Sequence, residues 1–230
     1  MPGRERFVER FPVLHGQAGL AHAFTLRDPQ VETAVERPQA LANLAGFHAG
    51  VIADLGFASA VTCEQVHGCE VAEVDADITP GSPTRDRPLP GCDGLVTHSP
   101  GILLGIYVAD CAAVYLFDPK ARAIGLVHSG KKGTELGIVP KAIGLMTTRL
   151  GARAEDIIVQ IAPCIRPPDY EIDFAAQIRR QSAEAGIAQC NLHDCATSTA
   201  SDLGRYYSYR LEKGKTGRML ALLGMRQIGD

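Results

Sequence analysis

The sequence predicts an α+β fold in which mixed β-sheets pack together and helices lie on the outside. Its 230 residues, 46% of them hydrophobic and 21% charged, are enough to bury a substantial core, so we expect one domain over residues 1–230. In the middle of the chain, apolar and polar residues alternate over 60–68 and 69–77, and short apolar runs follow, as is typical of strands. Helical patterns do not alternate strictly with these runs, which argues against a doubly wound parallel sheet.

The first helix is expected over residues 37–56. Apolar side chains recur there at three- and four-residue steps, Pro38 lies at the start of the pattern, and Gly56 follows its last turn. This spacing indicates an amphipathic helix that covers one face of a sheet.

The strands of the central region follow. We expect them over residues 60–68, 69–77, 93–98, 101–110, 112–118 and 123–130. Residues 79–91, between the second and third of these strands, contain four prolines and three charges, which predicts a solvated loop.

The C-terminal part adds two helices, one more strand and a hairpin. Thr134 is a candidate cap for a helix that runs past Pro140 and ends near Gly151. The remaining elements are expected as a buried strand over 156–163, a helix over 173–186, and a hairpin over 205–225 that turns at 212–217.

Charge and composition exclude several classes of protein. The net charge is −3 and the pI about 6.2, so we expect no binding to nucleic acid or to an anionic membrane surface. The N-terminal residues do not resemble a secretory signal, and no run approaches the roughly 20 apolar residues of a membrane span. Seven cysteines without a C-x-x-C pair favour reduced thiols, and together these observations predict a cytoplasmic protein.

Three side chains that could bind a metal lie where predicted strands end. They are His67 in EQVHG, Cys111 in VADC and His128 in VHSG. Two imidazoles and one thiolate are ligands that Zn²⁺ prefers, and three protein ligands with one open position are typical of a catalytic zinc site. The separations of 44 and 17 residues are unlike the close ligand pairs of zinc fingers, so on spacing alone a buried cysteine and two strand-capping histidines are the commoner interpretation.

The same stretches carry a resemblance to a known family. EQVHG, CDGLVT, GILLGIYVADCAAVYLFDP, AIGLVHSGKKGT, APCI and YYSYR with TGRM occur in the order found in the laccase-domain, YfiH-like family, over residues 60–225. Members are known both as polyphenol oxidases and as purine nucleoside phosphorylases. The resemblance implies that His67, Cys111 and His128 bind a metal, which is expected to be zinc, with copper as the alternative.

The resemblance also implies an activity. We expect a zinc-dependent purine nucleoside phosphorylase with adenosine deaminase activity, which uses phosphate and acts on adenosine, inosine and methylthioadenosine. Asp110 is expected to join the three ligands as a catalytic residue. The expected partners are therefore small molecules, a purine nucleoside and phosphate.

Residues expected to contact substrate are Gln65, Arg27, Arg210 and Lys132. The family usually continues the histidine turn as A-G-W-R-G, whereas this chain has Lys131 and Lys132 in place of the tryptophan and arginine. Lysine keeps the positive charge but lacks the planar fork with which arginine binds a phosphate through two hydrogen bonds. The lost tryptophan removes a stacking surface for a purine, which leaves the tyrosines at 107, 206, 207 and 209 as candidates.

Other functions use the same residues. Without a metal, Cys111 as nucleophile and His128 as general base predict an amidohydrolase that acts on a peptide or a cell-wall precursor. A binding module without activity is a third interpretation. Multicopper oxidation is the least favoured chemically, because seven histidines, few of them clustered, are too few for it.

Overall fold

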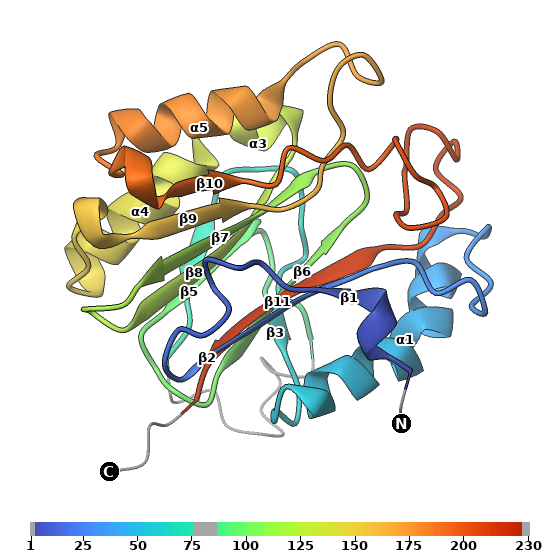
Figure 1. The fold of residues 1–230 in the computed structure, drawn as a ribbon, viewed down its shortest axis with the longest axis horizontal. Coiled ribbons are helices and arrows are strands. Elements are labelled where there is room, and N and C mark those ends of the chain that lie inside the picture. Colours follow the sequence, from blue (N-terminus) through green and yellow to red (C-terminus); the bar gives the residue numbers. More distant parts are fainter. Residues whose placement is uncertain (1–2, 76–86, 227–230) are drawn as a thin grey trace.

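The computed structural model describes residues 3–75 and 87–226, and in these ranges two mixed β-sheets pack face to face with helices on their outer faces (Figure 1). This arrangement confirms the predicted α+β class. Residues 79–86 of the expected loop, and the last two residues of the expected strand 69–77, lie outside the described residues.

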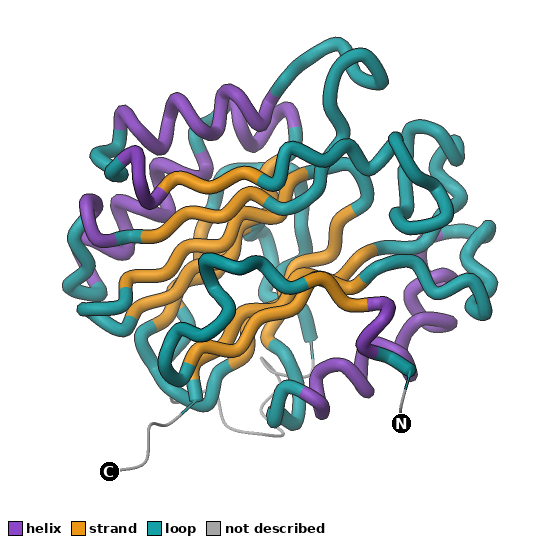
Figure 2. The backbone as a smooth tube through the Cα atoms, in the orientation of Figure 1, coloured by secondary structure: helices purple, strands orange, loops and turns teal. Residues whose placement is uncertain are grey.

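The first sheet has five strands and one covering helix. Its strands are, in spatial order, β1 (Val8–Glu9), β2 (Leu20–Thr25), β11 (Met219–Met225), β6 (Leu103–Val108) and β3 (Val61–Thr62). The helix is α1 (Arg37–Asp54), as expected from the apolar spacing, and it packs on the outer face through Val51. Figure 2 shows this helix beside the first sheet and away from the other helices.

The second sheet has six strands and lies under the remaining helices. Its strands are, in spatial order, β10 (Leu192–Asp194), β9 (Ile158–Ile161), β7 (Ala112–Asp118), β8 (Ala123–Ser129), β5 (Gly94–Thr97) and β4 (Val71–Glu73). The helices are α3 (Lys131–Glu135), α4 (Ile138–Arg149) and α5 (Phe174–Glu184), with short 3₁₀ turns at Glu5–Phe7, Ala154–Asp156 and Gln189–Asn191.

Alternating side chains of β7 hold the layers together. Tyr115 and Phe117 point into the core between the two sheets, whereas Val114 and Leu116 pack under the helices. Burying each of these side chains stabilises the fold by about 1.5–3 kcal/mol. The Tyr115 hydroxyl also donates a hydrogen bond of 2.7 Å to the carbonyl oxygen of Ala23, and this bond joins the two sheets.

The chain passes from the first sheet to the second between β6 and β7. Only Ala109, Asp110 and Cys111 separate these two strands. In the second sheet β7 pairs antiparallel with β8, and this register places Ala113 opposite His128. The fold therefore brings Cys111 and His128 to the same end of neighbouring strands.

The expected strand over 60–68 was too long. The strand ends at Thr62, apart from one isolated bridge at Cys63, because Gln65 and His67 have φ angles of 61° and 59°. Such left-handed conformations cannot continue a strand, so the segment turns away as a loop.

Two expectations for the second half were also wrong. Residues 205–218 form turns and no strand, and β11 pairs with β2 and β6, so the expected hairpin over 205–225 does not form. Thr134 does not cap α4: it is buried inside α3, where its hydroxyl donates to the carbonyl oxygen of Gly130, and Gly137 precedes α4.

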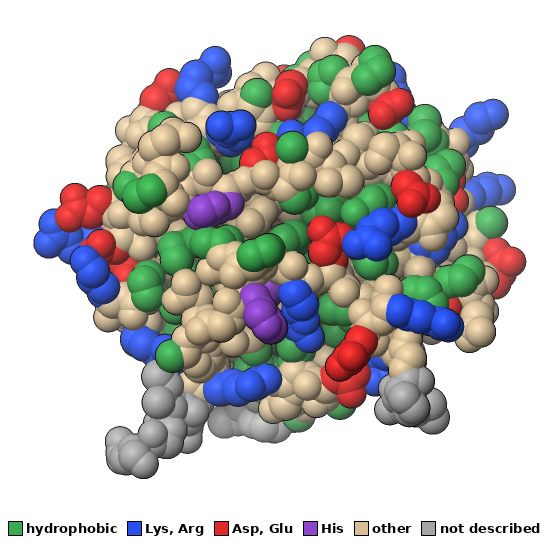
Figure 3. All heavy atoms as spheres, in the orientation of Figure 1, with side chains coloured by type: hydrophobic (Ala, Val, Ile, Leu, Met, Phe, Trp, Pro, Cys, Tyr) green, Lys and Arg blue, Asp and Glu red, His purple; other side chains and the backbone are tan. Residues whose placement is uncertain are grey.

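Charged side chains of both signs share the surface (Figure 3). On the face drawn in Figure 3, Lys and Arg side chains are interspersed with Asp and Glu side chains. Among the described residues, no helix is long and apolar enough to cross a bilayer.

Candidate metal centre

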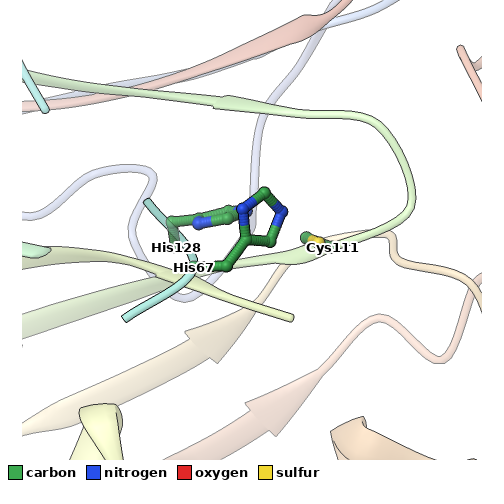
Figure 4. Close-up of side chains that lie close together, drawn as sticks. All are labelled: His67, Cys111 and His128. Carbon is green, nitrogen blue, oxygen red and sulfur yellow. The ribbon is translucent and has the colours of Figure 1, made fainter. Parts of the chain in front are cut away.

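His67, Cys111 and His128 converge on one point, as Figure 4 shows. One ligand atom of each residue lies within 4.8 Å of the ligand atoms of the other two. The two imidazole rings meet edge to face, with centroids 4.9 Å apart and planes at 80°. Within residues 3–75 and 87–226 this is the one group of three metal-binding side chains that close together.

Local backbone geometry places two of these side chains. His67 is itself in the left-handed region, and Asp110, the residue before Cys111, has a φ of 81°. For residues other than glycine such conformations cost of order 1–3 kcal/mol and persist where the surrounding structure holds them. The turns that direct His67 and Cys111 toward one another are therefore maintained by contacts elsewhere in the fold.

Asp93 supplies one set of those contacts. Its fully buried carboxylate accepts hydrogen bonds from the backbone N–H groups of Val66, His67 and Gly68 at 3.1, 2.9 and 2.8 Å. It also accepts one from Nδ1 of His128 at 2.8 Å, which leaves Nε2 of that ring free to bind a metal. One carboxylate thus fixes the loop that carries His67 and the orientation of His128.

Gly130 leaves room for the sulfur of Cys111. A Cβ atom at this position would lie 2.6 Å from Sγ of Cys111 and 3.8 Å from the ring of His67. No side chain larger than hydrogen fits there without moving the thiol.

The metal-free cluster favours charged ligands. Burial raises the pKa of the Cys111 thiol, but hydrogen bonds with His128 and His67 outweigh burial and bring this pKa to about 6. Burial lowers the pKa of His128, whereas its hydrogen bonds to Asp93 and Cys111 raise it to about 9. A thiolate beside an imidazolium is a site that a cation can enter by displacing a proton.

The donor set fits a metal that prefers nitrogen and sulfur. Two imidazoles and one thiolate match the three-ligand zinc sites of enzymes, in which the fourth position stays open to water or substrate. His128 is 4% exposed while His67 is at the surface, so the cluster is closed on one side and open on the other.

The open side faces a cavity of about 1110 Å³. Seven lysines and arginines line it, among them Arg37, Lys132, Arg210 and Arg218, against three acidic residues. Tyr107, Tyr209 and Phe174 contribute aromatic surface. A cavity of this size and charge is suited to an anionic or polar ligand with one flat apolar part.

Lys132 and Arg210, both predicted to contact substrate, line this cavity. Lys132 lies exposed in the first turn of α3. Arg210 lies over the ring of Tyr170 at 5.0 Å and pairs with Glu171 at 3.2 Å.

Gln65 and Asp110 also line the cavity, but their side chains are already engaged with the protein. The Gln65 amide donates to the carbonyl oxygen of Tyr107 at 2.6 Å and accepts from its N–H at 2.9 Å. The Asp110 carboxylate accepts hydrogen bonds from the hydroxyls of Thr199 and Ser208 and from the N–H of Arg210. Both side chains hold the walls of the cavity in place.

Arg27 lies outside the cavity lining. Its guanidinium donates to Glu212 at 2.6 Å and to the carbonyl oxygen of Tyr206, and it covers the ring of Tyr207. Arg27 therefore anchors the 205–218 segment and does not line the cavity.

Asp93, Gly130 and Arg37 belong to the site, but the sequence interpretation did not single them out. Asp93 lies in the CDGLVT motif and Gly130 in VHSG, so the motif positions were a signal for both. Arg37 carried none, because it is the first residue of a surface helix 30 residues before His67.

Comparisons with known proteins identify the family of the chain. The family model described as multi-copper polyphenol oxidoreductase laccase matches residues 38–176 and 169–226. A protein of Deinococcus radiodurans named purine nucleoside phosphorylase is 34% identical, with 89% of this chain and 88% of the relative covered. Purine nucleoside phosphorylase YlmD of Geobacillus stearothermophilus is 31% identical, with 73% of this chain and 72% of the relative covered.

Solved structures share the fold. The crystal structure of YlmD from Geobacillus stearothermophilus superposes with a TM-score of 0.81 at 26% identity, and covers 92% of this chain and 93% of its own. The Bacillus licheniformis hypothetical protein YfiH superposes with a TM-score of 0.79 at 22% identity, and covers 90% of this chain and 93% of its own. The chain therefore belongs to the family of multi-copper polyphenol oxidoreductase laccases.

Proposed function

We propose that this chain is a zinc-dependent purine nucleoside phosphorylase that also deaminates adenosine. The observation that carries the proposal is the convergence of His67, Cys111 and His128 at the floor of a cation-lined cavity. The names of the relatives from Deinococcus radiodurans and Geobacillus stearothermophilus support the phosphorylase part. Adenosine, inosine and methylthioadenosine are the proposed substrates.

Phosphorolysis needs an anion site and a site for the base. An oxygen of phosphate attacks C1′ of the ribose, the bond from C1′ to the purine nitrogen breaks, and the base leaves with the electron pair and takes up a proton. The lysines and arginines of the cavity wall, Lys132 and Arg210 among them, are suited to hold the phosphate. The rings of Tyr107 and Tyr209 offer apolar surface for the base.

Deamination of adenosine uses the metal cluster. The oxygen of water replaces the amino group at C6, and that group leaves as ammonia. His67, Cys111 and His128 would hold a zinc ion, which would supply Lewis-acid chemistry for this replacement. The chain's own contribution is the orientation of His128 by Asp93 and of the Cys111 turn by Asp110.

Product analysis tests the proposal. Purified protein is incubated with adenosine, with and without phosphate, and the products are separated. We expect adenine and ribose 1-phosphate only when phosphate is present, and inosine in both cases. Cys111→Ala is the inactive comparison, and Cys190→Ala, which removes an exposed thiol elsewhere, is the matched control. If the unmodified protein forms no more product than Cys111→Ala, the proposal is wrong.

One observation favours a second candidate function. Asp93, His128 and Cys111 form a hydrogen-bonded line of carboxylate, imidazole and thiol, which is the arrangement of a cysteine hydrolase. Such an amidohydrolase would act on a peptide or a cell-wall precursor without metal. Elemental analysis separates the two functions: one equivalent of zinc that is absent from His67→Ala favours the phosphorylase, and a metal-free active protein favours the hydrolase.

A further inference from the structure

The positive charge around the cavity is largely unpaired. Of its seven lysines and arginines, Arg210 pairs with Glu171, and Lys215 lies 3.9 Å from Glu36. The other five form no ion pair with any residue in the described part of the chain; they are Arg37, Lys131, Lys132, Lys213 and Arg218. In a chain of net charge −3, this concentration of cations indicates a place where an anion binds.

Arg218 differs from the other four because its guanidinium is held in one orientation. Nη1 donates to the carbonyl oxygens of Thr216 and Gly217 at 2.9 and 2.8 Å. The ring of Tyr209 covers one face, with its centroid 5.6 Å from Cζ. Nε and Nη2 have no acceptor among the described residues, so the edge that they form is free. This edge is the one with which arginine binds two oxygens of a phosphate.

The segment behind Arg218 is fixed as well. The Thr216 hydroxyl donates to Glu212 at 2.5 Å, and Glu212 is paired with Arg27 at 2.6 Å. At Gly217 a Cβ atom would lie 2.6 Å from the ring of Tyr207, so the backbone that carries the two carbonyl acceptors packs directly on that ring. Arg27, Glu212 and Thr216 therefore hold Arg218 in position before any ligand arrives.

Arg37 brings a second guanidinium to the same place. It lines the same cavity from the first residue of α1, and its charge is near enough to Arg218 to repel it. Arg37, Arg218 and Cys111 all line this one cavity. Two guanidinium groups that line one cavity, one of them half-buried and neither in an ion pair with a described residue, provide positive charge for an anion.

We propose that Arg218 and Arg37 form a subsite for a phosphate group, with Arg218 binding two of its oxygens and Arg37 supplying a second charge. Its use as the site of the attacking phosphate rests on the proposed phosphorylase function. The group can arrive as free orthophosphate or as the 5′-phosphate of a nucleotide, because both present the same three oxygens to the arginines.

Titration calorimetry on the zinc-loaded protein tests the subsite without turnover. Orthophosphate is one probe and adenosine 5′-monophosphate the other, each with the unmodified protein, Arg218→Lys and Arg37→Ala. Arg218→Lys keeps the charge but loses the fork, and we expect a Kd at least about tenfold weaker. Arg37→Ala, at an exposed helix start that tolerates alanine, should weaken binding by a similar factor. Arg180→Ala, on the exposed face of α5, is the matched control and should leave the Kd unchanged.

The two probes identify the source of the phosphate group. Weaker binding of orthophosphate in both variants assigns the subsite to the free anion, whereas an effect on the nucleotide alone assigns it to a phosphate carried by the substrate. If neither variant changes either Kd while both remain folded, the subsite is wrong. Phosphate binding that depends on Arg218 in a protein without activity on nucleosides would instead overturn the proposed function and leave the subsite standing.

Discussion

At the scale of single residues, Asp93 determines how two of the three metal ligands are presented. Its carboxylate holds three successive N–H groups around His67 and the Nδ1–H of His128. These bonds lower the pKa of Asp93 although burial acts to raise it. This position needs a group that accepts four hydrogen bonds and donates none, and an ionised carboxylate meets that need.

Asp93→Asn is expected to weaken zinc binding by roughly 10- to 100-fold. The neutral amide orients His128 poorly, and its own N–H group faces the N–H groups that the carboxylate accepts from. We also expect the free energy of unfolding to fall by about 1–3 kcal/mol. Competition with a chromogenic chelator measures the first quantity and urea titration the second. Glu70→Gln, an exposed acid on the same loop, is the control, and equal zinc affinity in the two variants would contradict the assigned role.

The reactivity of Cys111 toward iodoacetamide should reveal the charge of its thiol in the metal-free protein. Because the pKa is lowered to about 6 and only the thiolate reacts, the rate should rise as pH increases to about 6 and level off above it. In His128→Ala the midpoint should move to higher pH, since the hydrogen bond that stabilises the thiolate is lost. A midpoint near 9 in the unmodified protein would show that this bond is not made.

The motifs EQVHG, VADC and VHSG predicted that His67, Cys111 and His128 bind a metal, because these motifs resemble those of a known family. Roles that depend on distant contacts were beyond sequence reasoning. The side chain of Gln65 forms hydrogen bonds with the backbone of Tyr107, 42 residues away. A glutamine in the sequence could equally well contact substrate, so the sequence alone does not reveal this structural role. Arg27 is a similar case, because its partner Glu212 lies 185 residues along the chain.

At the scale of elements, the turn from β8 into α3 controls how closely the chain approaches the thiol. Gly130→Ala places a Cβ atom 2.6 Å from Sγ of Cys111, so the sulfur must move. We expect zinc affinity to fall by roughly 100-fold or more with little change in the free energy of unfolding. Gly144→Ala in the middle of α4, where a Cβ atom meets nothing within 4 Å, is the control.

The Gly144→Ala variant also tests the stability of α4. Gly144→Ala should keep full zinc affinity and raise the free energy of unfolding by about 0.5–1 kcal/mol, because alanine is the better helix former. Chelator competition and urea titration on both glycine variants give the comparison. Equal zinc affinity in the two would mean that the turn has room for a side chain.

Periodicity predicted helices and strands well where an element is long. The apolar spacing of α1 and the short apolar runs of β7 and β8 give each the correct type and nearly the correct ends. The hairpin over 205–225 was wrong because Tyr206 and Tyr207 are buried in turns, so their aromatic content imitated a strand. The five-residue helix α3 is too short to have a period of its own.

At the scale of the whole molecule, the three candidate metal ligands come from both sheets and from the connection between them. Cys111 lies in the connection from β6 in the first sheet to β7 in the second, and His67 follows β3 of the first sheet while His128 is in β8 of the second. An ion bound by these residues would therefore add a direct link between two sheets that are otherwise held together by packing of the interior. Composition and pattern predicted sheets that pack together with helices outside, but they could not predict the strand order, since it depends on pairings as distant as Leu220 with Tyr107.

Zinc is expected to stabilise the protein against unfolding. At a free zinc concentration 100 times the Kd, linkage gives about 2.7 kcal/mol, and the stabilisation should be visible as a higher Tm. His67→Ala should abolish the dependence of Tm on zinc, and His193→Ala, in the edge strand β10, should retain it. A Tm shift that survives in His67→Ala would place the ion elsewhere.

Asp110 gives the wall of the cavity a fixed point next to Cys111, one of the three candidate metal ligands. Two separate loops end on its carboxylate, one through Thr199 and the other through Ser208 and the N–H of Arg210, and the residue that follows it is Cys111. Insertions or deletions in these loops can reshape the entrance as long as each loop still delivers its donor to the same two oxygens. The fold thus separates the part that can diversify toward new substrates from the part that must stay constant, and loop grafting at these positions is a rational route to altered specificity.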